Sequence, residues 1–327
     1  MVKRVQFISL LMAVFVLACN IANKNDEKAH AHGLLPAGIV CDTVAIEDMD
    51  IKNPFIVYDE VADTYYMTGD NGHLWVSKEL RTWVGPYNVL RYDTTSWLGA
   101  SPVITSPEIH KHNGKYYYMA SFETKARHSC TTLVSNSITG PYESIESKKL
   151  LLDKNETAVH PTFCADEFGT GYMIYDNLGE QNGNGTVQII RYTEDLGRRM
   201  GEAFVMFRAS DIPWTGNGEH AHVLESPFLF YSGEEGLGIL FTAYCGEEKA
   251  IGVAYSSTGT LNGPWVVEDA PLLKGVEGVA MFNDYDGTPV LVTTREALQN
   301  GTIKSVPVLM KTDLQFEKIQ IKGNYKF

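Results

Sequence analysis

Short apolar runs separated by polar or glycine-containing turns follow one another from about residue 50 to the end of the chain. Five times, an apolar run that starts at a small turn is followed by a second run, and most of these second runs are rich in aromatic residues. The five pairs of runs are 53–58 with 65–67, 106–110 with 116–119, 160–163 with 172–174, 226–230 with 239–241, and 278–282 with 290–292. Runs of this length between turn residues predict β-strands, and each pair predicts a β-hairpin.

Prolines mark the start of four of these hairpins and give the repeat its length. Pro54, Pro107, Pro161 and Pro227 are 53, 54 and 66 residues apart. A third run follows each hairpin and ends near a turn, and these runs are 74–77, 132–135, 187–192, 252–256 and 308–310. A period near 50 residues built from short strands is typical of propeller blades. The sequence therefore predicts an all-β chain folded as a five-bladed β-propeller.

Two other architectures fit the pattern less well. Five βαβ units would need apolar residues at helical spacing between the strands, and the intervals lack them. A pair of β-sandwiches with accidental internal similarity remains the alternative. The length of the repeating region suits one large β domain, which we place at 39–327.

The N-terminal segment differs from the repeats. A basic pair precedes an apolar run over 5–18, which is too short to span a bilayer and has the form of a secretory signal. Small residues before Cys19 are similar to a bacterial lipoprotein cleavage site, which predicts a signal peptide at 1–18 and lipidation of Cys19. Residues 19–38 are mostly polar and predict a flexible tether. We expect an exported lipoprotein at the outer membrane or cell surface, with an ordinary cleaved signal as the alternative.

Charge and cysteine content exclude several function classes. The formal net charge is −13, which argues against nucleic acid and against electrostatic docking on anionic lipid. Contact with a membrane is therefore expected only through the lipid anchor. The remaining cysteines lack C-x-x-C spacing and do not favour zinc. Export permits disulfides, but Cys164 and Cys245 lie in apolar strands, where free buried thiols are common.

Polar residues occupy the starts of the predicted inner strands. These positions hold Asn53, Glu108, His160, Glu225 and Glu277. Ionisable groups beside apolar strands are costly to bury unless they face a wet cavity. Inner strands of a propeller present side chains to the central funnel, so we expect one polar pocket there as the candidate site. Turn residues that only satisfy strand ends are the alternative, most strongly for Glu108.

Several segments resemble glycoside hydrolase family 43. The resemblance is closest over 204–265, where Phe-Arg-Ala-Ser-Asp-Ile-Pro-Trp at 207–214 is followed by Leu-Glu-Ser-Pro-Phe-Leu at 224–229. Ser-Pro-Glu-Ile-His at 106–110 is similar to the Ala-Pro-Glu-Val-His phrase of that family. The resemblance implies a five-bladed propeller that acts on oligo- or polysaccharides containing arabinose, xylose or galactose.

The resemblance also implies roles for three residues, with two departures. The family is known for inversion with a base carboxylate, an acid, and an aspartate that raises the pKa of the acid. Glu225 stands at the acid position, Asn53 at the base position, and His160 at the position of the third aspartate. An asparagine cannot take up a proton at neutral pH as a carboxylate does. In the fifth blade, Glu277 replaces a histidine of the family.

Three interpretations remain open. The first, which we favour, is a glycosidase with relocated groups, in which Glu277 or Glu108 is the base and His160 shares proton transfer with Glu225. The second is a sugar-binding surface lipoprotein without turnover, in which Asn53 and His160 hydrogen-bond the ligand. The third is a different reaction on the same scaffold, because a fold does not dictate a function.

Other candidate residues follow from their chemistry. Trp97 and Trp214 are expected in loops between blades, where an indole can stack on a sugar, with packing between blades as the alternative. His222 is a candidate to orient Glu225. His220 and His222 form a His-x-His pair, which is a weak metal signal. The resemblance also implies a histidine beside a central calcium in some relatives, and this chain lacks that histidine. We therefore expect no metal and no other cofactor.

Overall fold

The computed structural model describes residues 42–125, 127–145, 157–166, 168–177, 183–232, 236–317 and 319–321. The predicted signal peptide, Cys19 and the tether lie outside the described residues. In the described part of the chain, no helix is long and apolar enough to cross a membrane. Two 3-10 helices are present there, η2 (Ile46–Asp48) and η3 (Ala209–Asp211).

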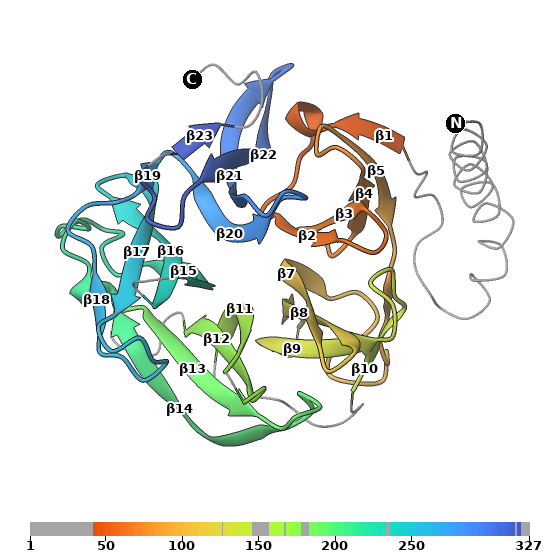
Figure 1. Ribbon diagram of the computed structural model, residues 1–327, viewed down its shortest axis with the longest axis horizontal. Coiled ribbons are helices and arrows are strands. Elements are labelled where there is room, and N and C mark those ends of the chain that lie inside the picture. Colours follow the sequence, from red (N-terminus) through yellow and green to blue (C-terminus); the bar gives the residue numbers. More distant parts are fainter. Residues whose placement is uncertain are drawn as a thin grey trace, which may run out of the picture.

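The described strands form five sheets, which follow one another around a central axis (Figure 1). The first blade contains β1 (Asp42–Ala45), β2 (Phe55–Asp59), β3 (Thr64–Thr68), β4 (Leu74–Ser77) and β5 (Thr82–Tyr87). The second contains β6 (Leu90–Arg91), β7 (Val103–His112), β8 (Lys115–Glu123), β9 (His128–Ser135) and β10 (Tyr142–Ser144). The third contains β11 (Ala158–Ala165), β12 (Gly171–Asn177), β13 (Thr186–Tyr192) and β14 (Arg199–Arg208).

The last two blades complete the ring. The fourth contains β15 (Leu224–Tyr231), β16 (Leu237–Cys245), β17 (Glu248–Ser256), β18 (Trp265–Val267) and β19 (Leu273–Lys274). The fifth contains β20 (Glu277–Asn283), β21 (Pro289–Gln299), β22 (Thr302–Thr312) and β23 (Ile319–Ile321). Figure 1 shows the first strand of each hairpin nearest the centre, namely β2, β7, β11, β15 and β20. The predicted all-β, five-bladed propeller is confirmed.

Each inner strand begins with the same backbone irregularity. At or near the start of each inner strand, one residue has a positive φ of 48° to 60°, and these residues are Asn53, Ser106, His160, Ser226 and Gly278. Four of the five have a side chain, for which a positive φ is uncommon. In the last four blades the pairing with the second strand shifts register at this point. We call these five the bulge residues, because an irregularity of this kind re-aims a side chain.

Hydrogen bonds from the bulge residues join neighbouring blades. The backbone N–H of Ser106 donates to Asp70 Oδ1 at 2.9 Å, and that of His160 donates to Ser121 Oγ at 2.8 Å. Ser226 and Gly278 donate in the same way, to Asp176 Oδ1 at 3.1 Å and to Thr242 Oγ1 at 3.0 Å. Each acceptor lies on the second strand of the preceding blade or just after it. These bonds satisfy buried amides and fix the angle between blades.

The ring closes between the fifth blade and the first. The amide of Ile51 donates to the carbonyl of Ser305 at 2.7 Å, and the amide of Ser305 donates to Asp50 Oδ1 at 2.9 Å. The hydroxyl of Tyr65 also donates to Asp284. One cluster of buried apolar side chains runs through the fourth, fifth and first blades, so apolar packing and hydrogen bonds both close the ring.

Candidate active site

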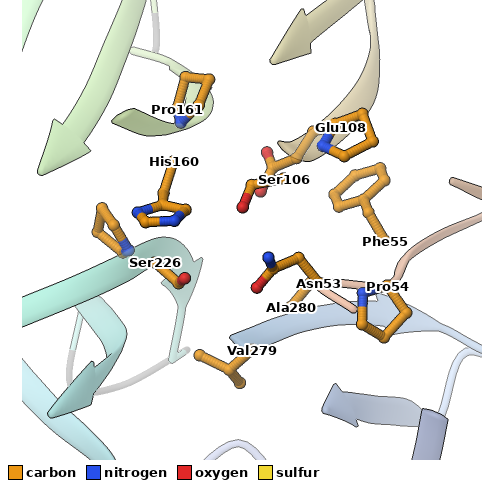
Figure 2. A pocket seen from close by; sticks show the side chains of 12 residues that line it. Asn53, Pro54, Phe55, Ser106, Glu108, His160, Pro161, Ser226, Val279 and Ala280 are labelled. Carbon is orange, nitrogen blue, oxygen red and sulfur yellow. The ribbon is translucent and has the colours of Figure 1, made fainter. Parts of the chain in front are cut away.

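A pocket at the hub of the propeller is lined by inner-strand residues of all five blades (Figure 2). Its cavity volume is about 20 Å³. The lining includes Asn53, Glu108 and His160, which the sequence placed there, together with Ser106 and Ser226. Their positions at or just after the bulges direct them to the axis. We call this the hub pocket.

Asn53 is held by a partly buried carboxylate, Asp70, that the sequence analysis missed. Its Nδ2 donates to Asp70 Oδ1 at 3.1 Å, and the same oxygen accepts the amide of Ser106. Burial raises the pKa of Asp70, and the hydrogen bonds from Ser106 and Asn53 offset this only in part. On the other side, Asn53 Oδ1 packs on the bare backbone of Gly278, where a Cβ would lie 2.5 Å away.

Replacing Gly278 by alanine is expected to destabilise the ring. A left-handed φ costs a residue with a Cβ about 1–2 kcal/mol, and here the methyl group also displaces Asn53. Gly287→Ala is the matched control, since Gly287 has a φ of +80° and nothing within 4 Å of its Cβ position. Urea unfolding of both variants separates backbone strain from contact. Equal losses would show that the contact with Asn53 contributes nothing.

His160 forms a pair with a fully buried carboxylate, Asp176. Its Nδ1 lies 2.8 Å from Asp176 Oδ1, which also accepts the amide of Ser226. The Asp176 side chain is 0% exposed and that of His160 is 17% exposed. Burial raises the pKa of Asp176 to about 6. Burial alone would lower the pKa of His160, but the charge and hydrogen bond of Asp176 outweigh it and the pKa is raised.

The hub pocket also contains a carboxylate. Glu108 is 8% exposed, and its Oε2 lies 2.6 Å from Nε2 of His110. The ring of His110 packs between Phe55 and Phe163, with centroid separations of 5.0 and 5.5 Å. Glu108 is therefore fixed in place while it faces the pocket.

Glu225 and Glu277 belong to a chain of alternating charges. Lys249 Nζ lies 3.1 Å from Glu225 Oε2 and 2.5 Å from Glu277 Oε2, and Lys52 Nζ lies 2.9 Å from Glu277 Oε1. Burial opposes the charge of Lys249, yet the two carboxylates raise its pKa. Burial likewise opposes the charge of Glu277, but the lysines lower its pKa. We call these four residues the ion-pair chain.

The predicted single cluster is divided between two hollows. Glu277 lines a second cleft of about 500 Å³, together with Lys52, Lys249 and Tyr244. Neither Glu277 nor Glu225 lines the hub pocket. Glu277 therefore does not share a pocket with Asn53 and His160, contrary to what the sequence suggested. Each of its two carboxylate oxygens instead contacts a lysine. The reason is register: Glu225 and Glu277 precede the bulge residues by one position.

The two tryptophans have packing roles. Trp97 meets Phe122 edge to face at 6.4 Å, and Trp214 stacks on Phe241 at 6.1 Å with an interplanar angle of 5°. Each is partly buried against the apolar core of a blade. These contacts are of the packing kind that the sequence left open as the alternative, and sugar stacking by the exposed part of either indole stays a prediction.

His222 is exposed on the turn before β15. Among the described residues, the hydrogen-bond partner of Glu225 is Lys249 and not His222. Lys249, Asp70 and Asp176 are thus the site residues that sequence reasoning missed. A signal was present for the aspartates: a polar residue recurs at a similar distance after each bulge residue.

No group of three or more His, Cys, Asp or Glu side chains that could hold a metal ion occurs in the described ranges. In the fifth blade, Glu277 stands where the resemblance implies a histidine, and it is bound by two lysines. Thr294, which pairs with Glu277 between β20 and β21, donates to the carbonyl of Ile51 at 3.5 Å. The residues present therefore do not fit a calcium ion, and none of the chemistry below depends on one.

Residues 45–277 match the sequence profile of the family described as Glycosyl hydrolases family 43. The match covers well over half of the chain. The chain therefore belongs to glycoside hydrolase family 43, and the resemblance noted in the sequence is confirmed. The comparison with curated proteins found no match.

Solved structures share the fold at low sequence identity. An endo-arabinase from Bacteroides thetaiotaomicron is 21% identical, with a TM-score of 0.73 over 87% of this chain and 99% of that chain. An endo-1,4-beta-xylanase from the same organism is 18% identical, with a TM-score of 0.68 over 86% and 97%. An alpha-L-arabinanase from Cellvibrio cellulosa, complexed with arabinohexaose, is 16% identical, with a TM-score of 0.59 over 84% and 96%.

Proposed function

We propose that this protein is a glycosidase that acts on oligosaccharides containing arabinose, xylose or galactose through a rebuilt set of proton-transfer groups. The observation that carries the proposal is the hub pocket, which brings Glu108 and the His160–Asp176 pair together in a family 43 propeller. The family membership and the arabinanase and xylanase structures that share the fold support the substrate class.

The proton-donor side consists of Glu225 and His160. Lys249 donates to Glu225 Oε2, and in this proposal Glu225 delivers its proton through Oε1. After Asp176, the charge of Glu225 contributes to the raised pKa of His160, although Glu225 does not itself line the hub pocket. His160 in its protonated form is a proton donor close to physiological pH.

The proton-acceptor side is Glu108. Of the two carboxylates that the sequence offered as a base, Glu108 lines the hub pocket, whereas both oxygens of Glu277 are in ion pairs. Figure 2 shows Glu108 and His160 on different sides of the pocket, with Asn53 beside them. Water gives a proton to Glu108 as its oxygen bonds to the anomeric carbon. The bond to the leaving oxygen breaks, and that oxygen takes a proton from Glu225 or His160.

Incubation of the purified protein with arabinan, xylan and galactan oligosaccharides tests this proposal. Chromatography of the mixtures should show shorter products from at least one substrate class. Calorimetry on the same panel measures binding independently of turnover. A protein that neither binds nor cleaves any of these oligosaccharides would refute the proposal.

A second function, sugar binding without turnover, is favoured by one specific observation. At the base position of the family, this chain has Asn53, whose amide donates to Asp70 and cannot take up a proton as a carboxylate does. Measurable binding without products from any oligosaccharide would establish this function in place of hydrolysis.

The variant Asn53→Asp is not expected to restore an ordinary base. It places a second carboxylate at the 3.1 Å contact with Asp70, and two like charges at this distance raise one pKa strongly. The added repulsion is absent while one carboxyl is protonated and develops as the pH rises. We expect a larger loss in Tm at pH 8 than at pH 5, relieved in Asn53→Asp/Asp70→Asn. A single variant as stable as the wild type at pH 8 would contradict this.

We also propose that the mature chain is an exported lipoprotein anchored through Cys19. The support is the apolar run over 5–18 and the small residues that precede the cysteine. Metabolic labelling with radioactive palmitate tests the proposal. Label should enter the wild type and not Cys19→Ala, and equal labelling of both would refute it.

A further inference from the structure

The acceptors that join the blades are of two chemical kinds. Ser121 and Thr242 use a hydroxyl to accept the amide of the next blade's bulge residue, at 2.8 and 3.0 Å. Asp70 and Asp176 use a carboxylate oxygen for the same purpose, at 2.9 and 3.1 Å. Because a hydroxyl suffices in two blades, joining the blades does not require a buried charge.

The carboxylates differ from the hydroxyls in a second contact. Asp176 Oδ1 also receives His160 Nδ1 at 2.8 Å, and Asp70 Oδ1 also receives Asn53 Nδ2 at 3.1 Å. Both His160 and Asn53 line the hub pocket. Asp70 and Asp176 therefore each hydrogen-bond a side chain of the pocket lining, although a negative charge away from water is costly.

The orientation of the Asn53 amide follows from this contact. A carboxylate accepts hydrogen bonds and does not donate them, so it selects Nδ2 and turns Oδ1 away from Asp70. Oδ1 then lies over the backbone of Gly278, at the wall of the pocket. An amide that donates to a carboxylate is also a better acceptor at its oxygen, because linked hydrogen bonds polarise one another.

We propose that Asp70 is a positioning residue for Asn53, and that the pair makes the hub pocket recognise a sugar hydroxyl that donates to Asn53 Oδ1. This rests on the proposed binding of oligosaccharides at the hub. The pocket wall thus selects a ligand with a hydroxyl at this point over one that offers only an ether or carbonyl oxygen there.

Two substitutions of Asp70 separate positioning from other roles. Asp70→Ser keeps an acceptor for the Ser106 amide, as Ser121 does for its neighbour, but its hydroxyl can donate and lets the Asn53 amide turn. Asp70→Asn keeps an oxygen in the place of Oδ1. Calorimetry should show oligosaccharide affinity about tenfold weaker in Asp70→Ser, comparable to one lost hydrogen bond, and within about twofold of wild type in Asp70→Asn.

Each other outcome overturns the proposal. Wild-type affinity in Asp70→Ser would show that Asp70 does not act on the ligand through Asn53. Equal loss in both variants would show that the charge itself is required and not the orientation. Thermal unfolding of both variants checks that the ring is intact, because a Tm close to that of the wild type excludes unfolding as the cause.

Hydrogen exchange of the Asn53 side-chain amide, measured without any oligosaccharide, separates this inference from the proposed function. In ¹⁵N-labelled protein, the Asn53 side-chain amide is assigned by its absence from Asn53→Asp. Its exchange with solvent should be slow in the wild type and in Asp70→Asn, and faster in Asp70→Ser. If no oligosaccharide binds to the wild type, the proposed function fails, while exchange still decides whether Asp70 holds Asn53. Unchanged exchange in Asp70→Ser would overturn the positioning role.

Discussion

Asp176→Asn is expected to lower the hydrolytic kcat at least 10²-fold while the propeller stays folded. The oxygen of the substituted side chain can still accept the Ser226 amide, which donates to Asp176 at 3.1 Å. The same oxygen can also accept from His160 Nδ1, which contacts Asp176 Oδ1 as well, but the charge that stabilises the imidazolium is gone. Loss of a positioned proton donor costs on the order of 10²–10⁴-fold in rate.

The pH profile tests the same pair. Because protonated His160 is the active form, activity should fall as the pH rises through the raised pKa of His160. Without the charge of Asp176, burial lowers that pKa, so the alkaline limb of the Asp176→Asn profile should move to lower pH. A kcat reduced less than tenfold, with an unmoved limb, would exclude His160 from proton transfer.

Stability should depend on this pair in a defined direction. Both pKa values are raised above those of the unfolded chain, about 3.8 for the aspartate and 6.5 for the histidine. The native state therefore binds more protons, and the stabilisation is present at low pH and lost as the pH rises from about 4 through the folded pKa of His160. The double variant His160→Gln/Asp176→Asn, which removes both titrating groups, should flatten the dependence of Tm on pH over this range.

Glu225→Gln is expected to reduce hydrolysis at least 10²-fold, because glutamine has no proton to deliver to the leaving oxygen. The ion-pair chain should survive, since the glutamine oxygen can accept from Lys249 and Lys249 keeps its contact with Glu277. Oligosaccharide affinity and Tm should therefore change little, and the loss should appear in kcat.

Glu268→Gln is the matched control for this variant. Glu268 is exposed just beyond β18, at the outer side of the same blade, so the same chemical change there should leave hydrolysis unchanged. A loss below tenfold in Glu225→Gln, or an equal loss in the control, would remove Glu225 from the role of acid.

Much of the fold was predictable because the inner strands have strong local signals. The proline-marked starts and apolar runs correspond to β2, β7, β11 and β15, and β20 lies at the fifth repeat. The third runs correspond to β4, β9, β13, β17 and β22. Strands of the outer edge were not predicted as such. β10 and β18 have three residues each, too few to show a period of alternation.

For the candidate site, the sequence predicted three residues of the pocket lining but not the residues that hold them in place. Asn53, Glu108 and His160 could be placed at the hub because each lies next to a proline that opens an inner strand. Their partners could not be chosen from the sequence. Val159 pairs with Asp176 and His160 falls in the register shift that follows, and a shift by one residue would turn the aspartate away.

By itself, the sequence determined the repeat, the number of blades and the polar residues at each inner-strand start, because these depend on local periodicity and turn chemistry. The tertiary structure decided which charges meet. Lys249 joins Glu225 to Glu277, and Asp70 and Asp176 support Asn53 and His160. These contacts depend on strand register and on the angle between blades, which the whole ring fixes together and no single segment encodes.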